Sequence, residues 1–141
     1  AGYVAEGARE TGADVIVKTV EKAEIEDLRE ADVIILGSPT YYGHSAGIVR
    51  SFLDKTVKLQ GKLEGKVGAA FSSAANIGGG NETAVLDLLE AMLIHGMIIQ
   101  GNSSGDHYGP VSIDRPDERV ATQCRELGRR AVRLSRRLQQ L

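Results

Sequence analysis

The chain has 141 residues, of which 42% are hydrophobic and 26% are charged, and its formal net charge is -2. This length fits one domain with a single core, and no apolar run is long enough to cross a bilayer. The near-neutral charge gives no general attraction to nucleic acid, and a lone cysteine, Cys124, excludes an internal disulfide framework. We therefore expect a cytoplasmic protein with a single domain over residues 1–141.

The first part of the chain alternates helix and strand patterns. Residues 1–10 read as helix, Gly12 suits a helix stop, and residues 15–17 are expected to form a strand. A short helix follows around Ile25 and Leu28. The unbroken apolar run at residues 33–36 is typical of a buried parallel strand.

The alternation continues to the end of the chain. A crossover helix is expected on the stripe Val49, Phe52, Leu53 and Thr56, and a strand over residues 67–71. The next helix carries the apolar face Val85, Leu88, Leu89, Met92 and Leu93, and Gly96 ends it. A strand at 97–99, a polar loop at 101–109 and a helix from near Pro116 complete a parallel α/β pattern.

The segment at residues 37–44 carries the strongest functional signal. It reads Gly-Ser-Pro-Thr-Tyr-Tyr-Gly-His and comes directly after the apolar run 33–36. Ligands of open α/β sheets bind beyond the carboxyl ends of parallel strands. Because Tyr41 and Tyr42 offer flat apolar surface to a planar ring, the pattern indicates a cofactor loop, with an ordinary turn as the alternative.

A second segment of this kind, residues 71–83, follows the apolar run 67–71 and is rich in serine and glycine. Its backbone N–H groups suit the polar edge of a heterocycle or an anion, and a flexible surface loop is the alternative. Asn81 or a neighbouring residue is suited to cap the helix that follows. Together the two segments predict one ligand site at the carboxyl edge of the sheet.

The motifs at residues 37–43, 52–54, 71–73, 78–82, 95–97 and 107–109 resemble the flavodoxin superfamily, most closely its WrbA-like branch of NAD(P)H:quinone oxidoreductases. The resemblance spans nearly the whole chain and implies a flavodoxin-like, doubly wound parallel sheet of strand order 2-1-3-4-5. It also implies FMN as cofactor and NAD(P)H as co-substrate. Carried over by position, the flavin-binding residues are Ser38, Pro39, Thr40, Tyr41, Tyr42, Gly43, Ser72, Ser73, Ala74, Ala75, Asn76, Ile77, Gly78 and Gly79.

The same resemblance implies two catalytic candidates. The histidine of the His-Gly-Met segment lies close to the flavin in the family, which makes His95 a candidate, with a cap at its helix end as the alternative. The Tyr-Gly segment of the family approaches the flavin pocket across a subunit boundary, which makes Tyr108 a candidate for shaping the substrate slot. A homo-oligomer, either a dimer or a tetramer, is implied as well.

The start of the chain departs from the family pattern. Flavodoxin-like proteins begin with an apolar strand and a Ser/Thr- and Gly-rich loop around the FMN phosphate, whereas residues 1–10 resemble the middle of the first helix. The first strand of the order 2-1-3-4-5 lies between two others, so its absence leaves inner edges unpaired. We expect the domain to be N-terminally incomplete, or another chain or segment to supply this strand.

The last helix combines an apolar stripe with an arginine-rich face. The stripe is Val120, Cys124, Leu127, Ala131, Leu134 and Leu138, which makes Cys124 a core residue rather than a nucleophile. The basic face carries Arg119, Arg125, Arg129, Arg130, Arg133, Arg136 and Arg137. Because no aromatic side chain accompanies them to stack on bases, a solvated face is favoured and no nucleic-acid partner is expected.

These features predict an FMN-dependent oxidoreductase that passes reducing equivalents from NAD(P)H to a small quinone-like acceptor. The sequence has no zinc signature, Ser-His-Asp set or paired carboxylate site, and no metal is expected. One alternative is a flavodoxin-type electron carrier for protein partners. The other is a flavin-free scaffold domain, which the lack of a phosphate loop favours.

Overall fold

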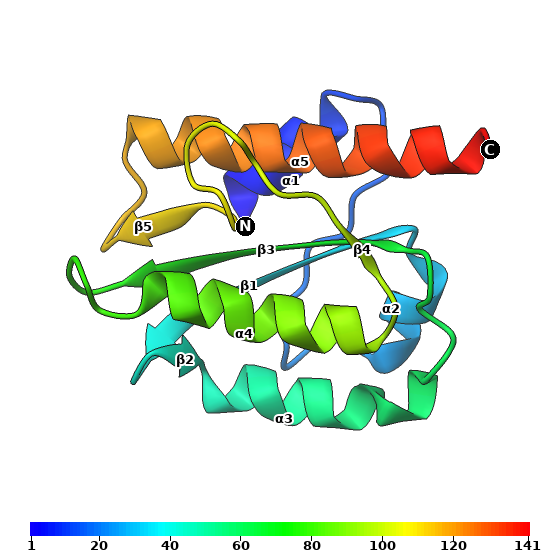
Figure 1. The fold of residues 1–141 in the computed structure, drawn as a ribbon, viewed down its shortest axis with the longest axis horizontal. Helices are drawn as coiled ribbons and strands as arrows, with labels where there is room; N and C mark the ends of the chain where they lie inside the picture. Colours follow the sequence, from blue (N-terminus) through cyan, green and yellow to red (C-terminus); the bar gives the residue numbers. More distant parts are fainter.

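A β-sheet lies between two layers of helices (Figure 1). The computed structural model describes all residues, 1–141. Helices α1 and α5 cover one face of the sheet, and α3 and α4 cover the other. The helices are α1 (Gly2–Arg9), α2 (Ile25–Glu30), α3 (Gly47–Lys55), α4 (Asn81–Ile94), α5 (Glu118–Gln139) and the 3-10 helix η1 (Thr56–Leu59). The strands are β1 (Val33–Tyr41), β2 (His44–Ser45), β3 (Val67–Ala74), β4 (Ile98–Ile99) and β5 (Val111–Ile113).

The sheet is built around the parallel pair β1 and β3, which runs in register from Val33 beside Val67 to Pro39 beside Ser73. Both β4 and β5 pair in parallel with the other edge of β3, β4 near its start and β5 near its end. The hairpin strand β2 pairs antiparallel with the end of β1. The expected order 2-1-3-4-5 is confirmed for its last three positions. In the structure these positions are taken by β1, by β3, and by β4 together with β5.

Two details of the expected strands are wrong. Residues 15–17 form no strand, and Ile16 and Val17 are 75% and 52% exposed. A strand needs a neighbouring strand to hydrogen-bond with. The edge of β1 away from β3 is paired only at Thr40 and Tyr41, which pair with β2, and residues 15–17 do not pair with it. The three-residue strand β5 was not expected; it lies between the expected polar loop at 101–109 and the expected helix from near Pro116.

The core has one apolar cluster on each face of the sheet. The larger cluster packs Ile34 and Ala70 against α3 and α4, and the smaller one packs Ala69 against α1 and α5. Cys124 belongs to the smaller cluster, as predicted, and its burial raises the pKa of its thiol. Leu93 is a correction, since it is 59% exposed at the last turn of α4 instead of buried.

The helices α1 and α5 touch through their backbones. A Cβ atom on Gly7 would lie 1.9 Å from the Arg125 carbonyl oxygen, and one on Gly128 would lie 2.2 Å from that of Val4. Only glycine allows this approach.

The predicted helix stop signals are confirmed, since Gly12 and Gly96 follow α1 and α4 with φ of +80° and +75°.

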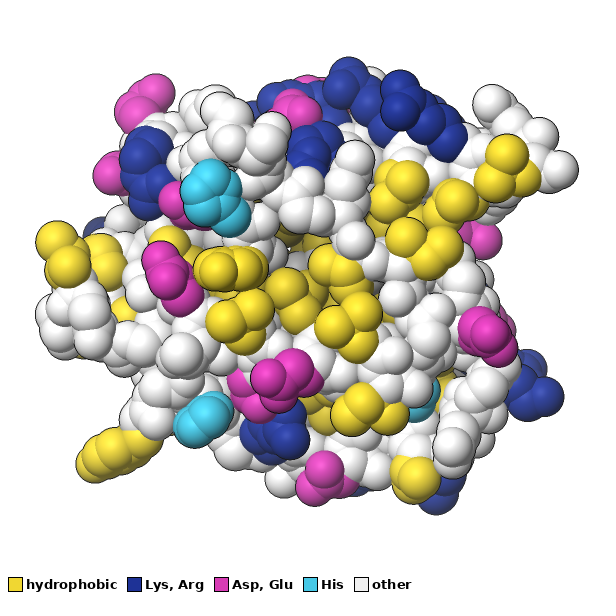
Figure 2. Space-filling view, viewed as in Figure 1, with side chains coloured by type: hydrophobic (Ala, Val, Ile, Leu, Met, Phe, Trp, Pro, Cys, Tyr) yellow, Lys and Arg dark blue, Asp and Glu magenta, His cyan; other side chains and the backbone are white.

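The arginines of α5 are less solvated than expected, because several of them bind neighbouring elements. Arg125 pairs with Glu6 at 2.9 Å, and Arg129 pairs with Glu10 and Glu126 at 2.5 and 3.0 Å. Hydrogen bonds to Glu126 and to Glu10 raise the pKa of Arg129. Basic side chains line the molecule over α5 (Figure 2). Much of this basic face therefore holds α1 against α5.

The α5 helix itself begins as predicted, with the Asp117 carboxylate accepting a hydrogen bond from the Val120 amide at 2.8 Å. None of the helices combines the length and apolar content that a bilayer crossing would need.

Candidate functional site

The two loop segments singled out in the sequence lie together at the carboxyl edge of the sheet. Pro39 and Ser73 are register partners on β1 and β3. Beyond the strands, a Cβ atom on Gly80 would lie only 2.6 Å from Gly43 Cα. The Thr83 hydroxyl lies 2.5 Å from the Gly43 carbonyl oxygen and 2.8 Å from the Gly80 carbonyl oxygen, and its single proton is shared between them. The segments 39–43 and 73–80 thus form one continuous surface.

The first segment is a tight hairpin between β1 and β2. Tyr41 pairs with His44, and the two residues between them, Tyr42 and Gly43, have φ of +48° and +83°. Positive φ at both positions is the requirement of a type I′ turn, and it is unfavourable for tyrosine. Tyr41 and Tyr42 project into solvent, with Tyr42 fully exposed. This conformation presents aromatic surface that contributes nothing to the core.

Thr40 belongs to the same segment and has a buried hydroxyl without a hydrogen-bond partner. Thr40 lies two residues after Ser38 on β1, so its side chain shares the face of Ser38 and not that of Pro39 and Tyr41.

The second segment turns away from β3 as an open loop. Ala75, Asn76, Ile77 and Gly78 are exposed, and their amide N–H groups donate to no protein acceptor. Gly78 and Gly80 have φ of +71° and +92°, a conformation that favours glycine. Gly79 is half-buried, and Ser73 presents a hydroxyl with no protein hydrogen bond. The loop therefore offers several free donors beside the aromatic turn.

Three of the expected flavin-binding residues make contacts within the protein. The Ser38 hydroxyl accepts from the Ala46 amide at 2.8 Å and donates to the Pro39 carbonyl at 2.7 Å. The Ser72 hydroxyl donates to the Asn81 carbonyl at 2.6 Å. Ala74 is buried and pairs with β5. Side chains alternate along a strand, so Pro39 and Ser73 face the opposite side from Ser38 and Ser72.

His95 does not reach this surface within one chain. It caps the end of α4, the helix that begins beside Gly80 and runs for 14 residues, about 20 Å, in the opposite direction. Its Nε2 lies 2.8 Å from the Thr56 hydroxyl, and its Nδ1 is buried without a partner. The geometry matches the helix-end role weighed as the alternative.

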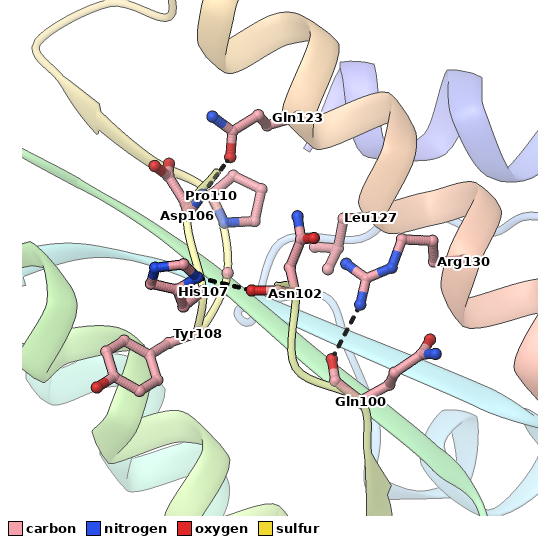
Figure 3. A pocket seen from close by; sticks show the side chains of 10 residues that line it. Gln100, Asn102, Asp106, His107, Tyr108, Pro110, Gln123, Leu127 and Arg130 are labelled. Atoms are coloured by element: carbon pink, nitrogen blue, oxygen red, sulfur yellow. Dashed lines mark hydrogen bonds between the residues drawn. The ribbon is translucent and has the colours of Figure 1, made fainter. Parts of the chain in front are cut away.

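Tyr108 lies on the other side of β3 from Tyr41. The residues after Tyr108 run alongside the edge of β3, where the Pro110 carbonyl accepts a hydrogen bond from the Ser72 amide at 3.0 Å. Tyr108 is 52% exposed and projects away from a small polar cavity between loop 100–110 and α5 (Figure 3). That cavity has a volume of about 10 Å³, room for one water molecule.

The polar groups around this cavity hold the loop to α5. The Asp106 carboxylate accepts from the Val111 amide and from Arg119, each at 2.9 Å. The Asp106 amide donates to Gln123 at 2.8 Å, and His107 Nδ1 lies 2.7 Å from the Asn102 carbonyl oxygen. These bonds make the surroundings of Tyr108 a structural support.

A larger groove of about 460 Å³ lies between residues 20–25 and α3, with Ile25, Ile48 and Phe52 on its apolar lining. The side chains of Tyr41 and Tyr42 and residues 75–78 are exposed to solvent. The surface formed by these two segments is therefore open rather than enclosed.

Two residues of the site were missed from the sequence. Thr83 and Asp87 lie one turn apart on α4 and both bind the 40–46 hairpin. Asp87 accepts from the Ser45 amide at 3.0 Å, from the Ser45 hydroxyl and from Arg50 at 2.8 Å. These partners lie about 40 residues away in sequence, so no local pattern indicates them.

These residues fit the ring end of FMN. The aromatic turn supplies flat surface, and residues 75–78 supply free amide donors. The hydroxyls of Ser38 and Ser72, by contrast, are used internally. No group of three or more His, Cys, Asp or Glu side chains is arranged to hold a metal ion.

Comparison with known proteins gives the same assignment. An NAD(P)H dehydrogenase (quinone) from Archaeoglobus fulgidus is 34% identical over 169 residues, covering 96% of this chain and 88% of that protein. A flavodoxin from Aquifex aeolicus is 37% identical over 139 residues, covering 92% and 75%. The solved structure of a flavodoxin, WrbA-like protein from Agrobacterium tumefaciens superposes with a TM-score of 0.80 at 26% identity, covering 96% and 87%.

The family model described as NADPH-dependent FMN reductase matches residues 3–108, which include both segments of the site. The chain belongs to the NADPH-dependent FMN reductase family and has the flavodoxin-like fold.

Proposed function

We propose that this protein is an FMN-dependent oxidoreductase that passes reducing equivalents from NAD(P)H to a quinone. The observation that carries the proposal is the joining of the aromatic turn 41–43 to loop 73–79, through Pro39 beside Ser73 and Gly43 against Gly80. Membership of the FMN reductase family supports the cofactor. The similarity to the Archaeoglobus fulgidus quinone dehydrogenase supports the nicotinamide donor and the quinone acceptor.

When bound, FMN supplies the electron-transfer chemistry, and the protein supplies position, electrostatics and access. Tyr41 and Tyr42 provide the apolar surface on which the ring packs. The free amides of residues 75–78 donate to its polar edge and stabilise negative charge there, as preorganised donors do in an oxyanion hole. Tyr41 and Tyr42 are exposed to solvent, so a flavin held there would remain accessible to a small donor or acceptor.

The test is anaerobic oxidation of NADPH or NADH by FMN-loaded protein with a benzoquinone acceptor. Turnover with saturation in both substrates and ping-pong kinetics is the expected result. Fully flavinated protein that oxidises neither nucleotide would exclude the reductase.

An electron carrier for protein partners is the second candidate, and the similarity to the Aquifex aeolicus flavodoxin favours it. It uses the same flavin surface. In the same assay a carrier accepts electrons only when a separate reductase protein is added, which distinguishes the two functions.

A homo-oligomer and a cytoplasmic location belong to the proposal as well. Apolar side chains gather across the face that carries α4 and the β4–β5 edge (Figure 2). Leu93, Ile94 and Ile98 are 59%, 85% and 37% exposed there. Because His95 lies far from the flavin surface of its own chain, its proposed catalytic role requires a second copy. The family resemblance places the proposed role of Tyr108 across a subunit boundary as well. Light scattering coupled to gel filtration tests this with the mass of the particle, and a monomer would exclude both roles.

A further inference from the structure

The aromatic turn is held by α4 through two side chains on one helix face. The Thr83 hydroxyl donates to the Gly43 carbonyl at 2.5 Å, and the Asp87 carboxylate, four residues later, accepts from the Ser45 amide at 3.0 Å and from the Ser45 hydroxyl. The two contact points are the last residue of the turn, Gly43, and Ser45, two residues after it. We call Thr83 and Asp87 the α4 clasp.

Asp87 is the stronger half of the clasp. Its side chain is only 11% exposed, and Arg50, which approaches at 2.8 Å, is the only cation paired with it. Ser45 is 5% exposed, so its amide has no ready replacement acceptor if the carboxylate is lost. A shielded carboxylate of this kind fixes the chain that it binds more firmly than an exposed ion pair does.

Thr83 ties the turn to the second segment of the site. The same hydroxyl lies 2.8 Å from the Gly80 carbonyl oxygen and shares its single proton with it. Gly80 and Gly43 approach so closely that a side chain at Gly80 would collide with Gly43. Helix α4 starts directly after Gly80, so loop 73–79 and the clasp belong to one connected element. Moving the turn away from loop 73–79 therefore requires both clasp contacts to break.

We propose that Thr83 and Asp87 are positioning residues that fix the spacing between the aromatic turn and loop 73–79, and so set the affinity for the flavin ring. This inference rests on the proposed function. The clasp side chains act through the backbone of residues 43–45, and the aromatic side chains act on the ring.

The test compares Thr83→Val and Asp87→Asn with matched controls elsewhere in the chain. Thr122→Val removes a hydroxyl that donates only to a carbonyl of its own helix, Glu118 at 3.0 Å. Asp106→Asn changes a carboxylate that also accepts from one amide and one arginine. The dissociation constant for FMN is measured by flavin fluorescence, and each clasp variant is expected to raise it about tenfold, the effect of losing one good hydrogen bond.

The double variant Thr83→Val/Asp87→Asn is expected to raise the constant by less than the product of the single effects, because both residues hold the same turn. The control variants are expected to leave it within about twofold. FMN affinity unchanged in both clasp variants, or lowered equally in Asp106→Asn, would overturn the inference.

Amide hydrogen exchange of the FMN-free protein gives a second readout that does not depend on flavin. The clasp variants are expected to speed exchange at residues 41–46 and to leave residues 104–111 unchanged, with the reverse pattern in Asp106→Asn. Unchanged exchange at residues 41–46 in Thr83→Val would also overturn the inference. A wild-type protein that binds no FMN would instead count against the proposed function, while the exchange pattern would still decide whether the clasp exists.

Discussion

Ser38 and Ser72 are register partners on β1 and β3, and each uses its hydroxyl to hold the start of the helix that follows its strand. Ser38 accepts from the amide of Ala46, the residue that precedes α3, and Ser72 donates to the carbonyl of Asn81, the first residue of α4. The side chains on the other face at this level, Pro39 and Ser73, are left free for a ligand. The division follows from strand alternation.

Replacement of these serines is expected to reduce stability unequally. Ser38→Ala leaves the buried Ala46 amide without an acceptor and should cost about 1–3 kcal/mol of unfolding free energy. Ser72→Ala leaves a carbonyl short of one donor, which proteins tolerate better, and should cost about 1 kcal/mol or less. Urea unfolding of both variants, with Ser73→Ala as the control expected within about 0.5 kcal/mol, gives the comparison. Equal losses at all three serines would contradict the division of roles.

Tyr42→Asn is expected to separate stability from ligand binding. Asn followed by Gly43 is the preferred sequence for a turn with two positive φ values, so the variant should be more stable by about 0.5 kcal/mol or more. The same change removes an aromatic ring from the flavin surface and should weaken FMN binding by about fivefold, about 1 kcal/mol of stacking. Thermal unfolding of the FMN-free protein and a flavin titration measure the two effects. A less stable variant that binds FMN normally would mean that Tyr42 serves the fold.

The contact between α1 and α5 predicts a steric effect at Gly128. A methyl group there meets the Val4 carbonyl oxygen at 2.2 Å, so Gly128→Ala should push the helices apart and cost about 1–3 kcal/mol, despite the higher helix propensity of alanine. Gly47→Ala, at an open position at the start of α3, is the matched control and should be neutral or stabilising. Chemical denaturation measures both. A stabilised Gly128→Ala variant would show that the helices do not approach so closely.

Cys124 is expected to resist alkylation in the native protein at pH 8 and to react readily in denaturant, because burial raises the pKa of its thiol. Since the folded-state pKa lies above the unfolded one, the Cys124 contribution to stability is complete below the unfolded pKa and is lost as the pH rises through the folded pKa. In Cys124→Ala, the part of the fall in unfolding free energy at alkaline pH that comes from this thiol should be absent. Rapid native labelling with iodoacetamide at pH 8 would contradict the burial of this residue.

The sequence predicted the central strands but not where they end. The apolar runs 33–36 and 67–71 identify β1 and β3, yet both strands continue through Ser38, Pro39, Ser72 and Ser73. Pairing of the two backbones extends the ladder into polar residues, and a hydropathy pattern does not contain that information. The expected strand at 15–17 fails for the complementary reason, since a β-like pattern forms no strand without a neighbour to pair with.

The sequence predicted that the two loop segments lie together, but not which of their side chains contact the protein itself. Tyr41 and Ser73 lie on neighbouring strands because each follows an apolar run, and the carboxyl ends of parallel strands share an edge. Which serines are free depends on the strand face, and the contact between Asp87 and Ser45 spans 42 residues of sequence. His95 matches a family motif, but the direction of α4 carries it away from the edge, and only the folded chain reveals this.

Joint binding of the flavin ring by the aromatic turn and loop 73–79 has a direct signature in solution. Amide hydrogen exchange of the full chain, followed by mass spectrometry with and without saturating FMN, tests it most directly. With FMN, we expect exchange to slow both in peptides that cover residues 40–45 and in peptides that cover residues 75–80. Protection of only one of these segments, or protection elsewhere with both unchanged, would contradict it.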